Sequence, residues 1–431
     1  MKKVGFYTLG CKVSQYETEA IAESFEAQGY EISDFSDVND VYVINTCTVT
    51  AEADRKSRQI IRRSKKKNPE GIVIVCGCYS QRSPEEVSAI PDVDAVIGSH
   101  GKMEIASIAE NLFKERKRHI SVTDIDDKPF EKMAITKGPR TRVYVKIEDG
   151  CECKCTYCAI PSARGRVRSK AKDDVIKEVV ALSKSGIKEI VLTGIETGSY
   201  GSDFDTEYRL SDLITDLDKI NAADQIRLGS LAPELIDKKF IDKVKDSKIL
   251  APHFHLSIQS GSNSVLHKMK RRYTREMALK NIEYIRANIK NATFTTDIMV
   301  GFPGESDEDF LDTVSFVKEA RFLDAHVFTY SKRKNTEAEK FSNQIDESVK
   351  KERSEKLMKV VKEVRESVLL DIVKREDARL TIFEEKRNGM WYGHTSNFAE
   401  ILVECKNNIQ SEAKYVKPIT LKDGYLIGKI I

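Results

Sequence analysis

Three cysteines, Cys151, Cys155 and Cys158, stand at a C-x3-C-x2-C spacing in one short segment. Thiolates this close cannot all pair as disulfides, and they are soft ligands that suit an iron–sulfur cluster or zinc. A structural zinc site would normally include a fourth cysteine or histidine at a similar spacing, and none follows nearby. Three ligands on a cubic 4Fe–4S cluster leave one iron open, where a substrate can chelate. The spacing therefore predicts an iron–sulfur cluster with one vacant iron.

Three further cysteines, Cys11, Cys47 and Cys78, occupy equivalent positions in the first part of the chain. Each follows an apolar run that predicts a β-strand, and each precedes a helical pattern. Alternation of this kind indicates a parallel sheet with helices on its faces. Because the carboxyl ends of parallel strands share one edge of the sheet, the three thiols are expected to converge there. The sequence thus predicts a second three-cysteine cluster, with three buried core cysteines as the alternative.

The elements behind this prediction lie within residues 1–115. The predicted strands are Val4–Leu9, Val41–Ile44, Ile72–Val75 and Val93–Ile97. The predicted helices lie near Gln15–Ala27, Ala53–Ser64 and Met103–Phe113. Cys76 falls inside the third strand and is expected in the core. Cys153 is expected to be a bystander thiol, because a side chain so close to its neighbours is badly placed to bind the same cluster.

The composition of the 431-residue chain fits two or three globular domains, with 40% hydrophobic and 32% charged residues. The net charge of +3 is too small to indicate nucleic-acid binding by itself. Nine cysteines without an even, regular framework argue against a disulfide scaffold. No segment approaches the roughly 20 apolar residues that span a bilayer, and the start is not expected to be a signal peptide. We therefore expect no membrane association and a reducing, cytoplasmic location.

Six strand-like runs separated by helical patterns follow in residues 139–368, which indicates a partial (β/α)6 barrel. The runs are Val143–Ile147, Glu189–Thr193, Ile226–Ser230, Phe254–Ile258, Thr293–Met299 and Ala325–Thr329. Chemistry in such barrels takes place at the carboxyl ends of the strands, and the loop from Cys151 to Cys158 follows the first run. The turns that follow the other runs are expected to face the same cavity.

The cysteine loop, with Tyr157 before its last cysteine, resembles that of radical S-adenosylmethionine (SAM) enzymes. The resemblance implies that SAM binds at the open iron and is contacted by the turns at the strand ends. Glu196 is expected to accept a hydrogen bond from the SAM ammonium, or to be an exposed turn residue. Gly301 lies in a Gly-Phe-Pro-Gly turn that resembles the one passing the adenine in these enzymes. The candidate SAM contacts are Tyr157, Thr193, Gly194, Glu196, Ser257, Gln259, Asp297 and Gly301.

The three amino-terminal cysteines stand in motifs that resemble those of methylthiotransferases. The motifs are Gly10-Cys11-Lys12, Asn45-Thr46-Cys47-Thr48-Val49 and Gly77-Cys78-Tyr79-Ser80-Gln81. The resemblance implies two 4Fe–4S clusters, of which the auxiliary one supplies the group that is inserted. Residues 10–12 and 45–58 look most like the branch that modifies N6-threonylcarbamoyladenosine beside the tRNA anticodon. The alternatives are modification of isopentenyladenosine or of a ribosomal-protein aspartate, and a non-catalytic iron–sulfur protein that binds RNA.

Residues after about 372 show short alternating runs and glycines that indicate a small antiparallel β-barrel. The predicted strands are Leu380–Phe383, Met390–Thr395, Ala399–Val403 and Leu426–Ile430. The module resembles a TRAM domain, an OB-like RNA-binding fold, and its aromatic side chains are expected in the core or stacked on bases. The resemblance implies an α/β fold with a methylthiotransferase amino-terminal domain at 1–115, a linker at 116–138, a radical SAM core at 139–368 and the TRAM domain at 372–431.

Eight lysines and arginines fall within Arg55–Lys67, on one predicted helix just beyond Cys47. A charge run is usually a solvated face, but this one is nearly single-signed, which also fits contact with phosphates. Other basic residues lie near the predicted mouth of the barrel. The candidate RNA contacts are Arg62, Arg63, Arg164, Arg166, Arg271 and Arg333. The expected partners are tRNA and an external electron donor, and the chain is expected to be a monomer.

Overall fold

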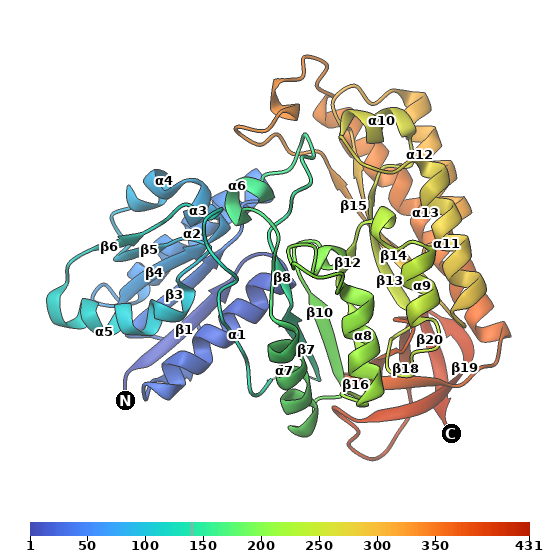
Figure 1. Ribbon diagram of the computed structural model, residues 1–431, viewed down its shortest axis with the longest axis horizontal. Coiled ribbons are helices and arrows are strands. Elements are labelled where there is room, and N and C mark those ends of the chain that lie inside the picture. Colours follow the sequence, from blue (N-terminus) through green and yellow to red (C-terminus); the bar gives the residue numbers. More distant parts are fainter. Residues whose placement is uncertain (139–140) are drawn as a thin grey trace. The chain divides into compact units, whose positions relative to one another are not determined.

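The computed structural model describes residues 1–138 and 141–431, and the chain forms two compact units, each described separately below (Figure 1). Unit 1 comprises Met1–Ile135, Tyr144–Lys170 and Ser331–Glu339. Unit 2 comprises Thr136–Val143, Ala171–Tyr330 and Lys340–Ile431. The predicted start of the central domain at Pro139 lies outside the described residues.

Unit 1 contains a six-stranded parallel sheet in the order β2-β1-β3-β4-β5-β6. Its strands are β1 (Lys3–Thr8), β2 (Glu31–Ser33), β3 (Val41–Thr46), β4 (Ile72–Gly77), β5 (Ala95–Ile97) and β6 (His119–Ser121). Every residue of β3 and β4 is buried, because helices cover both faces of the sheet. Two-sided burial explains why these strands are visible in the sequence as continuous apolar runs.

The helices of unit 1 divide between the two faces of this sheet. On one face, α1 (Lys12–Ala27) and α5 (Ile105–Glu115) share a core with β1, β3 and β4. On the other face, α2 (Ala51–Lys67) packs beside the short helices α3 (Cys78–Arg82) and α4 (Pro84–Ser88). The remaining short elements are η1 (Lys102–Glu104), β8 (Glu148–Asp149), α6 (Ile160–Arg164) and β9 (Arg168–Ser169). The predicted alternation of strands and helices is thus confirmed.

Two strands of this sheet, β2 and β6, were not expected from the sequence, and β6 lies within the predicted linker. Both have only three residues, and neither contains a buried residue. Edge strands of this kind pair through backbone groups alone, so they leave no apolar run to detect. Residues 119–121 of the predicted linker therefore belong to the sheet.

Unit 2 contains parallel strands in two sheets, with the orders β11-β10-β7 and β12-β13-β14-β15. The strands are β7 (Arg142–Lys146, which begins in this unit), β10 (Glu189–Thr193), β11 (Gln225–Leu228), β12 (Ser230–Leu231), β13 (His253–Gln259), β14 (Thr293–Val300) and β15 (Asp324–Thr329). The helices between them are α7 (Lys172–Lys184), η2 (Thr197–Ser199), α8 (Leu210–Lys219), η3 (Pro233–Leu235), α9 (Lys238–Val244), α10 (Asn263–Lys268), α11 (Arg275–Asn288) and α12 (Asp307–Ala320). The predicted α/β class with parallel strands is confirmed.

A long helix and a small barrel complete unit 2. After η4 (Ala338–Lys340), α13 (Glu347–Lys374) packs on β15 and α12 and reaches the barrel through the buried Leu369 and Ile372. The closed barrel has the order β16-β17-β18-β20-β19, and its β18–β20 pair is parallel. Its strands are β16 (Arg379–Arg387), β17 (Met390–Thr395), β18 (Glu400–Val403), β19 (Ala413–Lys422) and β20 (Tyr425–Ile430). In the described parts of the chain, no helix is both long and apolar enough to cross a membrane.

The barrel confirms the predicted small β-fold and adds β19, which the sequence analysis missed. In β19 the buried side chains are Val416 and Pro418 alone, while Ile419 is exposed, so the strand lacks a clear apolar alternation. The aromatic residues considered for base stacking are used internally. Trp391 and Tyr392 are buried, and the ring of Phe398 stacks on His394 with 4.7 Å between centroids. The core interpretation therefore holds for these side chains.

A buried carboxylate anchors the first sheet of unit 2. Glu189, at the start of β10, is fully buried and forms ion pairs with Arg142 and Arg227. It also accepts a hydrogen bond from Gln225 Nε2 at 3.0 Å. Burial opposes ionisation, but the two guanidinium groups outweigh it and lower the pKa of Glu189 from 4.5 to about 2. The carboxylate thus stays charged at any pH at which the protein functions.

We expect Glu189→Gln to lower the free energy of unfolding by about 3–5 kcal/mol at pH 7, because two guanidinium groups lose their counter-charge. The folded pKa lies below the unfolded one, so the stabilisation is complete above about pH 4.5 and declines as the pH falls towards about 2. Urea unfolding of both proteins between pH 7 and pH 3 measures this, and the exposed substitution Glu355→Gln is the control. A difference that does not change below pH 4.5 would contradict the assignment.

Candidate metal centres

The three amino-terminal cysteines follow three neighbouring strands of the unit 1 sheet. Cys11 caps α1 beyond β1, Cys47 follows β3, and Cys78 is the first residue of α3 after β4. The sheet order places β1, β3 and β4 side by side. Cysteines that are 36 and 31 positions apart in sequence are therefore brought to one edge, which confirms their predicted convergence.

Local packing explains why an asparagine and two glycines stand next to these cysteines in the sequence. Asn45 at the end of β3 donates a hydrogen bond to Ser14 O at 2.9 Å, which holds the first turn of α1 against β3. Gly77 has a φ of +98°, and a Cβ there would lie 2.5 Å from Asn45 Oδ1. A Cβ at Gly10 would lie 3.3 Å from Cys47 Cβ. The glycines thus allow the backbone to bring the cysteines close together.

The other two cysteines of this set also act on the pKa of Cys47. Its pKa is raised to about 12, chiefly by burial and further by the nearby Cys78 and Cys11. Among the residues that the structure describes, no three His, Cys, Asp or Glu side chains are gathered tightly enough to hold a single metal ion. Each cysteine of a 4Fe–4S cube binds a different iron, so its ligands lie further apart than those of one ion. An all-thiolate set of three neighbours fits a cluster better than a lone ion.

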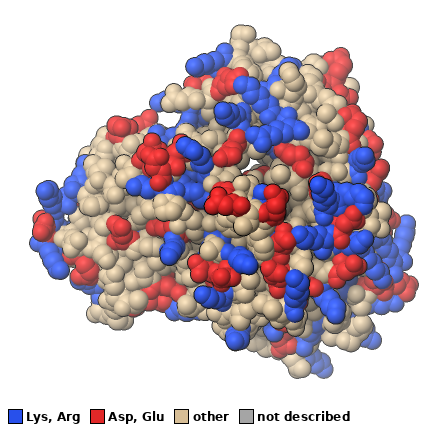
Figure 2. Space-filling model, in the orientation of Figure 1, with Lys and Arg blue, Asp and Glu red and all other residues tan. Residues whose placement is uncertain are grey.

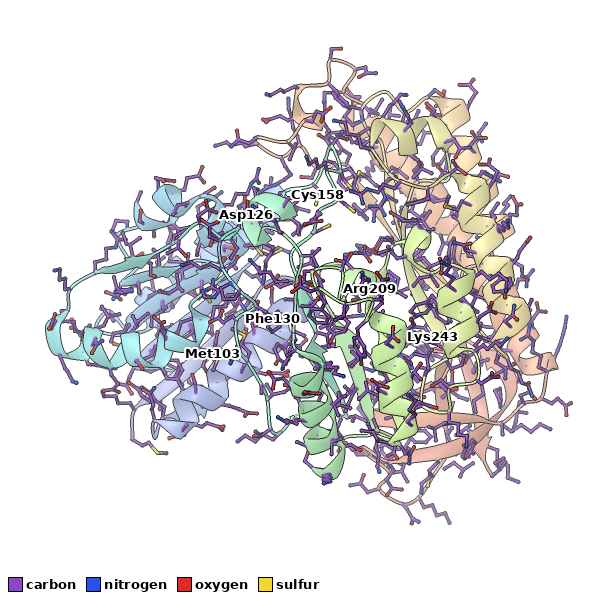
Figure 3. All side chains as sticks on the ribbon, in the orientation of Figure 1. Met103, Asp126, Phe130, Cys158, Arg209 and Lys243 are labelled. Atoms are coloured by element: carbon purple, nitrogen blue, oxygen red, sulfur yellow. The ribbon has the colours of Figure 1, made fainter. Side chains whose placement is uncertain are left out.

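The second set, Cys151, Cys155 and Cys158, lies on a loop of unit 1 that leads into α6 (Figure 3). All three side chains are partly buried. The backbone nitrogen of Ile160 donates to Cys158 Sγ at 3.4 Å. Amide groups directed at sulfur stabilise thiolates and tune the potential of a bound cluster. The loop therefore has the donors and the half-open position that a cluster ligand set requires.

The loop is held by a close backbone approach at its beginning. Gly150 has a φ of +90°, and a Cβ there would lie 1.8 Å from Arg166 O. Cys151 N donates to Gly165 O at 2.9 Å. Only glycine fits at residue 150, because a side chain would collide with the returning chain. The segment therefore closes on itself at the first cysteine.

Arg164 connects the segment that follows the second cysteine set to Cys78 of the first set, within unit 1. It is fully buried at the end of α6, six residues beyond Cys158, and its Nε donates to Cys78 Sγ at 3.1 Å. The helices α3 and α6 pack against each other. The sequence gives no indication of this contact, because the two residues are 86 positions apart.

A buried network of charges surrounds Arg164. Its guanidinium contacts Glu17 at 2.5 Å and Asp149 at 3.2 Å. The other cations in this network are Lys102, which pairs with Glu17; Lys146, which pairs with both carboxylates; and Arg168, 3.8 Å from Asp149. Burial opposes ionisation of Glu17, but these cations hold its pKa well below the usual range. Four cations therefore surround two carboxylates beside a sulfur that becomes anionic on binding iron.

The expectation that Arg164 contacts RNA is wrong, because its side chain is fully buried and paired. Arg333 is also buried, and its Nη2 donates to Thr48 and to Asp54 at 2.8 and 2.7 Å. It is not placed for contact with a surface phosphate. Arg166 is exposed, and Arg271 is partly buried with its Nη2 donating to Ser257 O. Arg164 and Arg333 were expected at the surface because they are charged. The sequence does not reveal their partners, which are distant in the chain.

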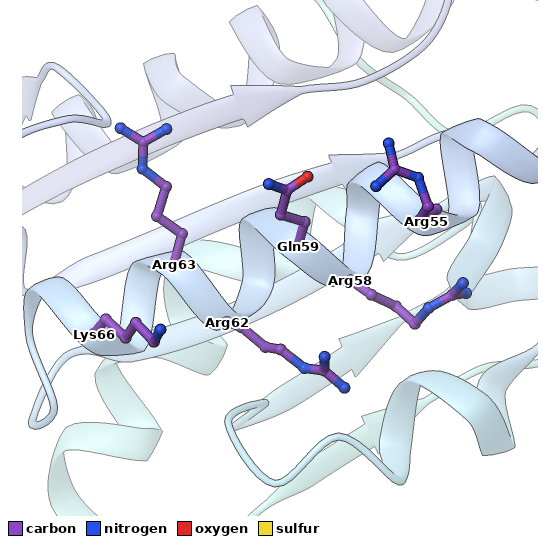
Figure 4. Close-up of a pocket in the computed structure, with 6 residues that line it drawn as sticks. All are labelled: Arg55, Arg58, Gln59, Arg62, Arg63 and Lys66. Carbon is purple, nitrogen blue, oxygen red and sulfur yellow. The ribbon is translucent and has the colours of Figure 1, made fainter.

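Arg62 and Arg63 are exposed on α2, as expected for a surface that contacts phosphates. With Arg55, Arg58, Gln59 and Lys66 they line a groove of about 450 Å³. Figure 4 shows these side chains in two rows along the helix, four residues apart within each row. Elsewhere positive and negative side chains are interspersed, as Figure 2 shows for one face. The groove is thus a local concentration of positive charge on a protein that is nearly neutral overall.

The candidate SAM contacts of unit 2 lie at the carboxyl ends of its parallel strands. Thr193 ends β10, Ser257 and Gln259 lie at the end of β13, and Asp297 lies on β14. Gly301 follows β14 with a φ of +69°, and a Cβ there would lie 2.3 Å from Lys350 Cγ. Apart from Asp297, which lies inside β14, these positions share the strand ends at which ligands bind in parallel α/β folds. Tyr157, on the cysteine loop, is the one candidate in unit 1.

The structure adds two observations about this group of strand-end residues. Glu196 is buried and accepts a hydrogen bond from Ala232 N at 2.8 Å, so it is not an exposed turn residue. His255 lies on the same face of β13 as Ser257, and its Nε2 is 3.2 Å from Asp297 Oδ2. The polar residues at alternate positions of 253–259 are the sequence feature from which His255 could have been predicted as part of this group.

Comparison with known proteins shows matches along nearly the whole chain. Residues 145–317 match the Radical SAM superfamily, and residues 3–98 match uncharacterized protein family UPF0004. The threonylcarbamoyladenosine tRNA methylthiotransferase MtaB of Bacillus subtilis (strain 168) is 40% identical over 99% of this chain and 95% of its own length. The tRNA-2-methylthio-N(6)-dimethylallyladenosine synthase of Pelotomaculum thermopropionicum is 36% identical over 84% of this chain and 82% of its own length.

Among solved structures, the radical S-adenosylmethionine methyltransferase TsrM of Kitasatospora setae has a similar fold. The TM-score is 0.57 at 15% identity, over 78% of this chain and 77% of that one. At this identity the likeness concerns the fold alone. It agrees with the parallel α/β arrangement described above.

We expect Arg164→Met to lower the free energy of unfolding by about 2–4 kcal/mol, because it removes one buried partner of Glu17 and Asp149. The adjacent exposed substitution Arg166→Met should change it by less than about 0.5 kcal/mol. Urea unfolding under nitrogen measures both. Equal effects of the two substitutions would show that the buried network does not stabilise the fold.

Proposed function

Because the chain belongs to the radical SAM methylthiotransferase family, we propose that it adds a methylthio group to N6-threonylcarbamoyladenosine beside the anticodon of tRNA. The observation that carries the proposal is the presence of two sets of three cysteines on one compact unit, where Arg164, six residues beyond the second set, donates to Cys78 of the first. The activity assigned by name to the Bacillus subtilis relative supports the choice of substrate. Dimethylallyladenosine in tRNA is the alternative, supported by the less similar relatives.

Two cluster sites follow from the donor sets. Cys11, Cys47 and Cys78 would hold the auxiliary 4Fe–4S cluster, and Cys151, Cys155 and Cys158 the cluster at which SAM binds. Bound together, SAM and the two clusters supply the one-electron chemistry and the sulfur that an unactivated aromatic carbon requires. The positive charge around Arg164 supports the auxiliary site, because a cluster held by three thiolates is anionic. An external electron donor is then required.

The residues of the chain position the reactants and exclude water. The proposed SAM contacts are the strand-end residues Thr193, Gly194, Glu196, Ser257, Gln259, Asp297 and Gly301, with Tyr157 from the cysteine loop. The turn after β14 requires glycine at residue 301, since its positive φ and the closely packed side chain of Lys350 leave no room for a Cβ. Hydrogen-bonding side chains at neighbouring strand ends suit a ligand with ammonium, carboxylate and ribose groups.

The target base must leave its stack to reach a cluster, so the tRNA is expected to be held by its backbone while one nucleotide is extruded. The groove of α2 supports this, because its exposed arginines match the charge of phosphates. The barrel at 379–430 resembles a module that binds RNA; its Trp391 and Tyr392 are buried, whereas Tyr415 on β19 is 57% exposed. The protein is proposed to act as a monomer in the cytoplasm.

Nucleoside mass spectrometry of tRNA tests the function directly. Cells that lack the protein should contain threonylcarbamoyladenosine without its 2-methylthio derivative, and the wild-type chain should restore the derivative. Cys78→Ala and Cys151→Ala should each abolish it and retain about four of about eight irons per chain. Cys405→Ser, in the barrel, should keep both the product and the iron. Loss of a methylthio group from dimethylallyladenosine instead would contradict the substrate, and about four irons in the wild type would contradict the two-cluster arrangement.

We expect the double substitution Arg62→Glu and Arg63→Glu to weaken tRNA binding, because it reverses the charge of the α2 groove. The slope of log affinity against log salt should fall in magnitude by roughly 1 to 2, since each arginine that neutralises a phosphate adds about one to the slope. Filter binding at several salt concentrations measures the slope. Lys359→Glu with Lys362→Glu, two exposed positions on α13, is the matched control. If both double substitutions lower the affinity equally, the groove is not a specific RNA contact.

A further inference from the structure

A cavity of about 900 Å³ lies within unit 1, between the start of α2, the helices α3 and α4, and residues 332–335. All of its lining residues belong to unit 1. The volume exceeds what a single amino-acid side chain occupies, so the cavity can admit part of a modified nucleoside. None of the roles described above uses it.

The cavity lies beside both cysteine sets. Tyr79 and Arg82 line it from α3, the helix that begins at the predicted ligand Cys78. Residues 332–335, which also line the cavity, lead to Ala338, whose backbone nitrogen donates to Thr156 O in the loop of Cys151 to Cys158 at 2.8 Å. A group bound in the cavity is therefore near the site at which both clusters are proposed to act.

The walls of the cavity carry more positive than negative charge. Five lining residues are basic, namely Arg58, Arg82, Lys332, Arg333 and Lys334, and three are acidic, namely Asp54, Glu85 and Glu86. Two of the acids are already paired, Asp54 with Arg333 at 2.7 Å and Glu86 with Lys334 at 3.3 Å. Arg82 has no carboxylate within 4 Å in the described parts of the chain, and it donates to the backbone oxygen of Lys334.

Arg82 is partly withdrawn from water and faces a second cation. Burial lowers its pKa, the neighbouring Arg333 lowers it further, and Asp54 and Glu339 oppose the change. Those two carboxylates are occupied, since Glu339 accepts a hydrogen bond from Asn335 N at 2.8 Å. In addition, Arg333 Nε is buried without a hydrogen-bond partner in the described structure. An anion that enters the cavity is therefore bound favourably by the guanidinium of Arg82.

The two candidate substrates differ in the chemistry that such a cavity recognises. A threonylcarbamoyl group carries a carboxylate, a hydroxyl and urea-type donors, whereas a dimethylallyl group is a hydrocarbon. Guanidinium groups bind carboxylates through paired hydrogen bonds. Covering the same cations with a hydrocarbon removes water without replacing its hydrogen bonds, which costs free energy.

We propose that this cavity receives the carboxylate of the threonylcarbamoyl group, and that Arg82 is a specificity-determining residue that distinguishes this substrate from dimethylallyladenosine. The proposal rests on the proposed function and identifies the part of the chain that recognises the modified base. Arg333 takes part by holding the cavity wall through Thr48 and Asp54.

The test compares three anticodon stem-loop RNAs that differ at one adenosine, which is unmodified, threonylcarbamoylated or dimethylallylated. Binding is measured by fluorescence anisotropy with the reconstituted protein. The wild type should bind the threonylcarbamoylated RNA about 10-fold more tightly than either of the others, the size expected for hydrogen bonds to a charged group. Arg82→Gln should remove this preference while leaving affinity for the unmodified RNA unchanged. Arg82→Lys should restore part of it.

Two further substitutions, one a control and one a second test of the cavity, accompany Arg82→Gln. Arg116→Gln, an exposed change elsewhere in unit 1, should leave the preference intact. Lys332→Gln is also exposed, so it should not affect folding, and it should weaken the preference in the same direction as Arg82→Gln.

Three outcomes would overturn the proposal. Equal loss of affinity for all three RNAs in Arg82→Gln would mean that Arg82 binds a phosphate. Retained discrimination in Arg82→Gln would place recognition elsewhere. No preference in the wild type would mean that the carboxylate is not recognised in binding. Failure of the proposed function is a separate result, because mass spectrometry of the wild-type product shows which base gains the methylthio group whatever Arg82 does.

Discussion

The structure of unit 1 depends on a buried set of charges centred on Glu17 and Arg164. Burying one charge alone is very costly, so each member is retained only while its partners are present. Glu17 lies on α1, Asp149 on β8 and Arg164 on α6, and the pairs between them hold these elements together. Arg164 also donates to Cys78 Sγ, which links the network to the edge of the sheet. A single guanidinium thereby fixes the relation between the loop of Cys151 to Cys158 and the strand ends that carry the other three cysteines.

This arrangement suits a reaction in which two redox centres act on one substrate. Groups that react in sequence gain most when they are held in place before the substrate arrives. Close backbone packing at Gly77 and Gly150 supplies the rigidity, since neither position has room for a Cβ. The buried cations supply the electrostatics, because Arg164 stabilises an anionic sulfur at the buried Cys78. Position and charge are thus provided by the same few residues.

The residues proposed to recognise the substrate are distinct from those proposed to hold the clusters. The net charge of +3 gives little general attraction for RNA, so binding must come from local concentrations of charge. The groove of α2 is exposed and suits the phosphates of a nucleic-acid backbone, because contacts to phosphates do not depend on the base sequence. The cavity around Arg82 suits one anionic group. The proposals therefore assign affinity for the polynucleotide and selection of one modified base to two adjoining surfaces of the same unit, which share Arg58.

The sequence by itself determined the chemistry and the fold class. Ligand type and spacing are local properties, and the apolar runs of β3 and β4 are continuous because both of their faces are buried. Only the tertiary structure decided which charged side chains are surface residues. Arg164 and Arg333 belong to basic stretches, yet both are buried, because their partners Glu17 and Asp54 come from segments 147 and 279 positions away. The short edge strands and the cavity beside Arg82 were invisible for the same reason, since they arise from contacts between segments that are distant in the chain.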